Sequence, residues 1–180
     1  IQVTHPATPP GAPGIYWGIA MKDIPWDMGK LEGWESSVGK RMSIVHFWTF
    51  WNQGGTMQKF QAEQASKVRA HGAIPMISWP SEKMGGGKSQ PDFRLSEIIN
   101  GRYDSYIRQW ATDAKNWGQP FFLRYGHEMN GPFYAWGEDA NGNKRGEFVK
   151  AWRHIRDIFT QVGATNASWV WCPNVDFPGS

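Results

Sequence analysis

Short apolar runs alternate with longer segments of mixed apolar and charged residues along this chain. The apolar runs cover residues 15–20, 42–48, 73–78, 120–125 and 167–171. Runs of this length that are bounded by glycine, proline or polar residues are typical of buried strands. The pattern therefore predicts five strands.

The segments between the runs show the spacing of amphipathic helices. Helical alternation covers residues 28–39, 57–71, 103–117 and 146–162, and each segment ends at or just before a glycine. Glycine is a common helix terminator because it adopts the left-handed conformation that closes the last turn. Strands that alternate with helices in this way predict an α/β fold with a parallel sheet. Residues 83–91 are predicted to be a flexible loop after the third strand.

The fourth strand runs directly into a group of polar side chains. Arg124, His127 and Glu128 follow it, and aromatic residues including Tyr134 and Trp136 come within the next turn. A carboxylic acid beside flat apolar rings is what a site needs to stack a sugar ring and protonate its glycosidic oxygen. The first hypothesis is therefore glycoside hydrolysis.

The segment resembles glycoside hydrolase family 26, whose best-known members are endo-β-1,4-mannanases with a (β/α)8 barrel and a retaining mechanism. The resemblance rests on Leu123-Arg124-x-x-His127-Glu128-Met129-Asn130-Gly131 with Tyr134 and Trp136 after it. Residues 99–104 and the pair Trp110-Ala111 also look familial, and the resemblance covers most of the chain from about residue 15. It implies an α/β fold of the (β/α)8 TIM barrel type.

The resemblance also implies roles for the motif residues. Glu128 falls on the general acid/base, His127 on the histidine near the nucleophile and the reacting sugar, and Arg124 on the arginine that precedes them. The family's nucleophile is a second glutamate after strand seven, which is expected beyond Ser180. Asp176 is the only internal alternative.

The length of the chain affects the expected domain organisation. A complete barrel needs about 250 residues, whereas this chain has 180. Residues 15–180 are therefore expected to supply the first five strand-helix units, without the C-terminal strands. A self-sufficient five-unit α/β domain is the alternative. Residues 1–14, rich in proline, glycine and threonine, are predicted to be a linker or a processed N-terminus.

Six further residues at or near predicted strand ends are predicted to contact the sugar. They are Trp136, Tyr134, Asn130, Trp79, His46 and Trp171. Trp136 is the preferred stacking platform. Packing in the core is the alternative for the tryptophans, and turn formation is the alternative for Asn130. For Glu128 the alternative is a structural ion pair with Arg124.

Composition and spacing argue against several other functions. The formal charge of +3 is spread over predicted helices, which gives no footprint for nucleic acid, and no apolar run is long enough for a membrane span. Cys172 is the only cysteine and is predicted to be a small core or cleft residue. His127-Glu128 begins like a zinc-protease motif, but Gly131 replaces the second histidine. No metal and no cofactor are predicted.

The expected function is hydrolysis of β-1,4-mannan type polysaccharide by a retaining endo-glycosidase, with the isolated segment inactive without its nucleophile. A β-1,3-1,4-glucanase or xylanase of the same family is one alternative, and a catalytically dead carbohydrate-binding fragment is another. The expected partner is the polysaccharide, and the missing barrel half or an appended carbohydrate-binding module is a further one. The resemblance implies a secreted protein.

Overall fold

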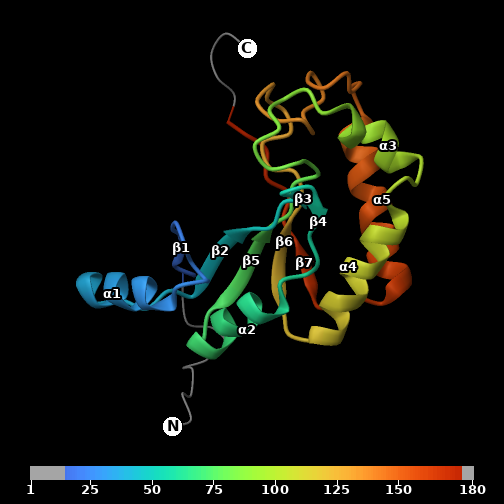
Figure 1. Cartoon of the computed structure of the whole chain (residues 1–180). Coiled ribbons are helices and arrows are strands. Elements are labelled where there is room, and N and C mark those ends of the chain that lie inside the picture. Colours follow the sequence, from blue (N-terminus) through green and yellow to red (C-terminus); the bar gives the residue numbers. More distant parts are fainter. Residues whose placement is uncertain (1–14, 176–180) are drawn as a thin grey trace. The chain divides into compact units, whose positions relative to one another are not determined.

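The computed structural model describes residues 15–175. Within this range the chain divides into two compact units. Figure 1 shows the chain coloured by residue number. The first unit contains the residues up to Phe47 and the segment Gln61–Met76, and the second contains Trp48–Phe60 and the residues from Ile77 onward. The predicted linker at 1–14 and the alternative nucleophile Asp176 lie outside the described residues.

The elements follow the predicted order of strands and helices. The strands are β1 Gly18–Ala20, β2 Ile44–Trp48, β3 Asn52–Gln53, β4 Thr56–Met57, β5 Ile74–Ser78, β6 Phe121–Arg124 and β7 Ala167–Trp169. The helices are α1 Met28–Val38, α2 Ala62–His71, α3 Leu95–Ile99, α4 Asp104–Trp117 and α5 Glu147–Val162, with a 3-10 turn η1 at Pro91–Phe93. All five predicted strands and all four predicted helices are confirmed, with shifted ends.

Two differences from the predicted elements have a local cause. The helix predicted from residue 57 begins at Ala62, because Thr56–Met57 pairs with Asn52–Gln53 in a small antiparallel hairpin. Gly54 and Gly55 form the turn of this hairpin, and both have a positive φ. The short helix α3 was not predicted, since a segment of one or two turns shows no helical period.

The main sheet has the strand order β1-β2-β5-β6-β7. The pairs β1–β2 and β6–β7 are parallel, with Gly18 opposite Ile44 and Phe121 opposite Ala167. Parallel neighbours that follow one another along the chain are the product of repeated strand-helix units. Strands β2 and β5 begin in the first unit and end in the second.

The first unit is held together by a buried carboxyl group on α1. This helix starts at Asp27, whose Oδ1 accepts the Gly29 N–H at 3.1 Å. Glu35, 7% exposed, accepts the Met42 N–H at 2.6 Å and lies 2.9 Å from His71 Nε2 at the end of α2. A buried carboxylate with hydrogen bonds to both of its oxygens stabilises the junction of these two helices.

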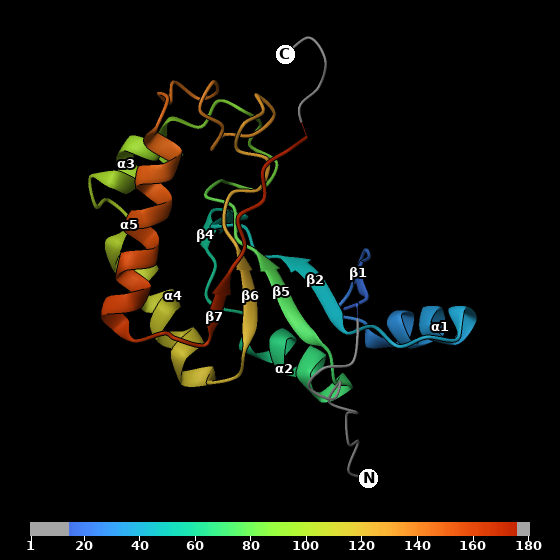
Figure 2. The same ribbon diagram turned by 180° about the vertical axis from the view of Figure 1, so that it is seen from behind.

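The second unit has a helical layer formed by α3, α4 and α5, which lie beside one another in Figure 2. The buried faces of α4 and α5 follow the three- and four-residue spacing of amphipathic helices, and each large apolar side chain buried there contributes about 1.5–3 kcal/mol. The buried residues of these two helices are Ile107, Trp110, Ala111, Ala114, Phe148, Ala151, Ile155, Ile158 and Phe159.

Candidate active site

The predicted motif lies where β6 ends beside β7. Main-chain hydrogen bonds join the two segments beyond the strands: the Val170 N–H donates to the Leu123 carbonyl at 2.9 Å, and the Glu128 N–H donates to the Cys172 carbonyl at 2.6 Å, one residue out of the strand register. Glu128 is half-buried and has a φ of 54°. A side chain other than glycine seldom adopts this left-handed conformation, and it persists where the surroundings hold it in place.

Gly126 allows the chain to turn between Arg124 and Glu128. Its φ is +56°, and an added Cβ would lie 2.5 Å from Cε2 of Phe148 and 3.1 Å from Cδ1 of Trp136. Only glycine fits this position without displacing two aromatic rings. The turn directs His127 and Glu128 out of the strand.

Asn130 joins the loop after β6 to the segment after β7. Its Oδ1 accepts the Asn174 N–H at 2.7 Å and its Nδ2 donates to the Asn174 carbonyl at 3.0 Å. Both ends of the amide therefore bind the main chain of one residue. This arrangement favours the structural alternative for Asn130 over sugar binding.

His127 is buried beneath the aromatic turn and is 8% exposed. Burial, together with the nearby positive charge of Arg124 as the smaller cause, lowers its pKa to about 4. The ring contacts Tyr134 and Trp136 with centroid distances of 4.7 and 5.1 Å. Its Nδ1 is buried and has no hydrogen-bond partner within residues 15–175. His127 is thus a neutral imidazole at physiological pH.

Arg124 points to the sheet face opposite the helical layer. Its Nε donates to Ser78 Oγ at 2.7 Å, and its Nη1 lies 3.7 Å from Cys172 Sγ. The next residue, Tyr125, stacks instead on Phe148 of α5 at 5.7 Å. Successive side chains of a strand point to opposite faces of the sheet, which explains why Arg124 and Tyr125 lie on different sides. Arg124, Ser78 and Cys172 therefore share one face.

Trp136 is a buried side chain that packs against its neighbours. It is 1% exposed, its Nε1 donates to the His127 carbonyl at 2.7 Å, and Tyr134 stacks on it at 4.5 Å with an interplanar angle of 5°. These contacts favour the packing alternative for Trp136, beneath His127 and Tyr134, and its stacking on a sugar stays a prediction. Tyr134 is half-buried and stays a candidate for substrate contact.

Trp79 and Trp171 lie on the helical side of the sheet. Trp79 is 0% exposed, donates from Nε1 to Tyr106 Oη at 3.2 Å and stacks on Trp110 at 4.4 Å. Trp171 is 49% exposed but packs edge-on against Phe148 of α5 at 5.5 Å. Each is adjacent in sequence to a residue of the Arg124 face, so alternation turns both rings away from it. The burial of Trp79 favours the packing alternative, and the sugar contacts predicted for Trp79 and Trp171 stay predictions.

His46 belongs to β2 in the first unit and is 9% exposed. Its predicted contact with the substrate stays a prediction. Metal binding has no support in the described part of the chain, where no group of three or more His, Cys, Asp or Glu side chains is arranged to hold an ion. No helix within residues 15–175 is long and apolar enough to cross a membrane.

The structure adds Glu82 to the predicted site residues. It is half-buried in the loop after β5, and burial raises its pKa to about 7. A signal for it exists in the sequence, because Glu82 follows the last residue of β5 by the same four positions that separate Glu128 from the end of β6. This matching offset was not used in the sequence prediction.

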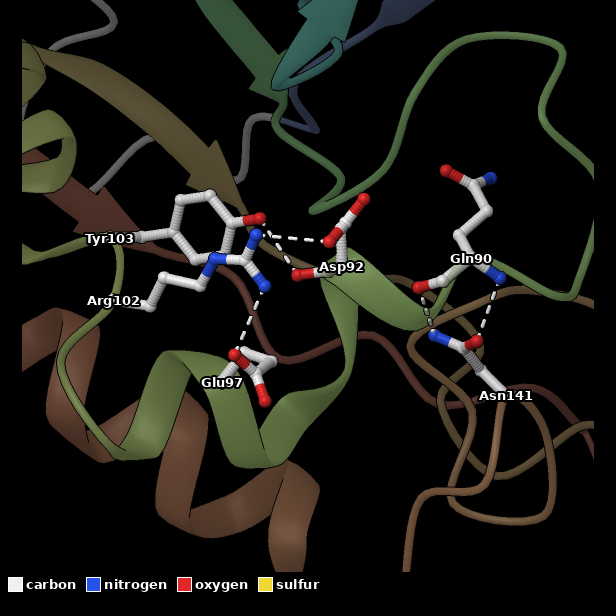
Figure 3. Close-up of polar contacts among 6 residues, drawn as sticks. All are labelled: Gln90, Asp92, Glu97, Arg102, Tyr103 and Asn141. Atoms are coloured by element: carbon white, nitrogen blue, oxygen red, sulfur yellow. Dashed lines mark hydrogen bonds and ion pairs between the residues drawn. The ribbon is translucent and has the colours of Figure 1, made fainter.

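The loop that contains Glu82 is fastened to the loop after β6. Figure 3 shows that the Gln90 N–H donates to Asn141 Oδ1 at 2.7 Å and that Asn141 Nδ2 donates to the Gln90 carbonyl at 2.8 Å. The side-chain oxygen of Gln90 also accepts the Lys83 N–H at 2.7 Å, and its Nε2 donates to the Gly87 carbonyl at 2.7 Å. The loop predicted to be flexible is thus closed by hydrogen bonds.

A second set of contacts in Figure 3 fixes the turn from α3 to α4. Arg102 binds Glu97 at 3.1 Å and Asp92 at 2.9 Å, and Tyr103 Oη donates to the Asp92 carbonyl at 2.7 Å. Asp92 directly follows the loop after β5 that contains Glu82 and Gln90. Its contacts with Arg102 and Tyr103 attach the end of this loop to the start of α4.

Comparisons with known proteins agree with the fold and the motif. Residues 33–179 match Glycosyl hydrolase family 26. Endoglucanase H of Acetivibrio thermocellus is 33% identical over 153 residues, which cover 83% of this chain and 16% of that protein.

Solved structures of the family share the fold at lower identity. A β-mannanase from a symbiotic protist of the termite Reticulitermes speratus, complexed with gluco-manno-oligosaccharide, has a TM-score of 0.62 and 16% identity, covering 86% of this chain and 56% of its own. The Podospora anserina GH26-CBM35 β-(1,4)-mannanase has a TM-score of 0.64 and 17% identity, covering 87% and 39%.

The chain spans only part of the length of each of these proteins. The predicted fold is confirmed, because the described strands and helices correspond to about half of a (β/α)8 barrel in the solved structures. A family match over most of the chain, on a parallel sheet that presents the predicted motif at its edge, identifies this chain as a member of glycosyl hydrolase family 26.

Proposed function

We propose that this chain is part of a retaining endo-β-1,4-mannanase in which Glu128 is the general acid/base. The observation that carries the proposal is the position of Glu128, which the hydrogen bond to the Cys172 carbonyl holds just past the end of β6. Catalytic groups of barrel enzymes lie at the carboxyl ends of strands. His127 and Tyr134 lie beside it and supply the buried and aromatic surroundings of a sugar site.

The reaction is a double displacement. In the first step a second carboxylate attacks the anomeric carbon, the glycosidic C–O bond breaks, and Glu128 transfers its proton to the leaving oxygen. In the second step Glu128 removes a proton from water, the water oxygen attacks the anomeric carbon, and the bond to the carboxylate breaks. The two carboxyl groups of such a pair lie about 5–5.5 Å apart.

The second carboxylate is assigned to a glutamate after the seventh barrel strand, outside the described residues. Arg124 is proposed to stabilise the negative charge of that carboxylate or to hydrogen-bond the sugar from the face that it shares with Ser78 and Cys172. The neutral ring of His127 is proposed to hydrogen-bond near the nucleophile through its buried Nδ1, which has no partner in the described part of the chain.

A β-glucan is the second candidate substrate. The solved neighbours are named mannanases but share only 16% and 17% identity with this chain, whereas the more similar protein, at 33%, is named an endoglucanase. We also propose that the protein is secreted, since a polysaccharide is too large to enter a cell intact. An appended carbohydrate-binding module, as the Podospora anserina name indicates for that protein, is a further proposal.

The test is release of reducing sugar from galactomannan, lichenan and xylan. It compares residues 1–180 with a protein that also contains the remaining barrel strands. We expect the longer protein to act fastest on galactomannan and the 180-residue chain to be far slower, because the covalent route needs both carboxylates. Faster release from lichenan identifies a glucanase. Binding to a polysaccharide without release from any of the three identifies a carbohydrate-binding fragment instead.

A further inference from the structure

Glu82 and Glu128 lie past the ends of two neighbouring strands. The Trp79 N–H donates to the Arg124 carbonyl at 3.0 Å, so β5 and β6 end side by side. Glu82 follows β5 and Glu128 follows β6 by the same number of residues. Both carboxyl groups therefore belong to the edge of the sheet where barrel enzymes hold their active sites.

The position of Glu82 is fixed through its main chain and its side chain. The Asn52 N–H donates to the Glu82 carbonyl at 3.0 Å, and Gln90 Nε2 lies 3.4 Å from Glu82 Oε2. Gln90 is 7% exposed and is held in turn by Asn141. The carboxyl group is thus presented from a closed loop that is fastened to the loop following the proposed acid.

Tyr134 links the two carboxyl groups electrostatically. Burial raises the pKa of its hydroxyl, and the negative charge of Glu128 raises it further; the positive charge of Arg124 opposes this, and Glu82 adds to it. The charges of Glu128, Arg124 and Glu82 therefore all act on the hydroxyl group of one half-buried tyrosine.

We propose that Glu82 is a substrate-binding residue whose carboxyl group hydrogen-bonds a sugar hydroxyl beside Tyr134. The inference rests on the proposed function, in which a sugar chain lies along this edge of the sheet with Glu128 as the acid. Carboxyl groups that are half-buried beside an aromatic ring are suited to bind a sugar, since the ring covers its apolar face and the carboxyl group its hydroxyls.

The protonation state of Glu82 strengthens this assignment. Burial raises its pKa to about 7, so below that pH the group is mostly a neutral acid that both donates and accepts. A neutral Glu82 also adds no second negative charge near Glu128. Glu82 acts on the Tyr134 hydroxyl together with the charged groups of Glu128 and Arg124. The raised pKa of Glu82 itself is caused by burial and not by these charges.

The experiment measures binding of β-1,4-mannohexaose and of a mixed-linkage glucan hexaose to the full chain by calorimetry. Titrations are made at about pH 5.5 and about pH 8.5, on either side of the raised pKa. The variants are Glu82→Ala and Glu82→Gln. The matched control is Glu97→Gln, which alters a half-buried glutamate paired with Arg102 instead.

The expected result separates hydrogen bonding from charge. At the lower pH, Glu82→Ala should weaken binding by about five- to tenfold, the effect of one lost hydrogen bond, whereas Glu82→Gln should stay within about twofold because an amide also donates and accepts. At the higher pH the wild-type chain should lose more affinity than Glu82→Gln, which has no proton to lose. Glu97→Gln should follow the wild type at both values.

Three outcomes would overturn the inference. Normal binding by a folded Glu82→Ala chain overturns it directly and leaves the proposed function intact. If Glu82→Ala does not fold, the comparison of the wild type with Glu82→Gln decides. The inference is overturned if both lose the same affinity for the hexaose between the lower and the higher pH. Failure of the wild-type chain to bind either hexaose overturns the inference, whereas the proposed function is tested separately by sugar release from the longer protein.

Discussion

The main-chain N–H of Glu128 donates a hydrogen bond of 2.6 Å to the carbonyl oxygen of Cys172. The proposed acid is thereby attached to the segment after β7, two residues before the Asn174 main chain that binds Asn130. A side chain that must deliver a proton to one oxygen needs a fixed backbone, because small displacements cost rate. The sheet itself supplies this position, although Glu128 lies beyond the end of its strand.

Replacement of Glu128 by alanine tests the assigned role in a protein that contains the complete barrel. Hydrolysis of polysaccharide should slow by about 10²–10⁴-fold, the contribution of general acid catalysis. Aryl glycosides with good leaving groups should lose much less in the first step, since their oxygen needs no proton. The measurement is kcat for both substrate types, from reducing-sugar and chromophore release.

Azide provides the control for this prediction. A small anion can occupy the space of the missing carboxyl group and attack the glycosyl-enzyme, so it should restore turnover of the aryl glycoside by the alanine variant. Equal losses on both substrates without rescue would argue for a structural carboxylate at Glu128.

The burial of Trp136 leads to a prediction on stability. Trp136→Ala should lower the free energy of unfolding by about 3–5 kcal/mol, the usual cost of removing a buried aromatic ring. The matched control is Trp171→Ala, which removes a ring that is 49% exposed and should cost about 1–2 kcal/mol. Urea titration of the chain measures both. A stable Trp136→Ala chain with weakened oligosaccharide binding would favour the sugar-platform role over packing.

The order of elements was predictable because it depends on local signals. Apolar runs located the five sheet strands, and Gly39, Gly72, Gly118 and Gly163 located the helix ends, where each has a positive φ. The motif around Glu128 was also visible, since the strand and its polar end are contiguous in sequence. Its assigned role still depends on the family resemblance.

The faces of the tryptophans were not predictable from the same signals. A change of one residue in register moves a side chain to the other side of the sheet. Trp79 lies next to Ser78, which contacts Arg124, yet its own ring stacks on Trp110. Trp136 is buried by Tyr134, close in sequence, but also by its approach to Gly126, and irregular loops give no period from which such contacts follow.

His127 should make stability depend on pH in a defined direction. Its pKa is about 4 in the folded chain and about 6.5 when unfolded, so the unfolded chain binds more protons between these values. The stabilising contribution of the neutral ring is complete above about pH 6.5 and decreases as the pH falls toward 4. Urea titrations of the wild type and His127→Asn across this range should show a smaller decrease in the variant. If the free energy of unfolding decreased equally in the wild type and the variant, the His127 ring would be protonated in the folded chain as readily as in the unfolded chain.

Glu82 should change stability in the opposite direction. Its pKa is raised from 4.5 to about 7 on folding, so the folded chain holds the proton more tightly between these values. Stability from this group is present below about pH 4.5 and is lost as the pH rises toward 7. Glu82→Gln should therefore remove a decrease in the free energy of unfolding between about pH 5 and pH 7 that the wild type shows. A variant whose curve matches the wild type over this interval would contradict the burial of the carboxyl group.

Gly126 and Gly54 form a matched pair for testing the turn before the acid. Their φ values are +56° and +60°, but an added Cβ would meet Phe148 at 2.5 Å in the first case and nothing within 4 Å in the second. Gly54→Ala should cost about 1–2 kcal/mol from backbone strain alone. Gly126→Ala carries the same strain plus about 1–3 kcal/mol for displacing the ring. Urea unfolding monitored by tryptophan fluorescence measures both costs. Equal losses in the two variants would show that Phe148 yields freely and that the turn is not what positions His127 and Glu128.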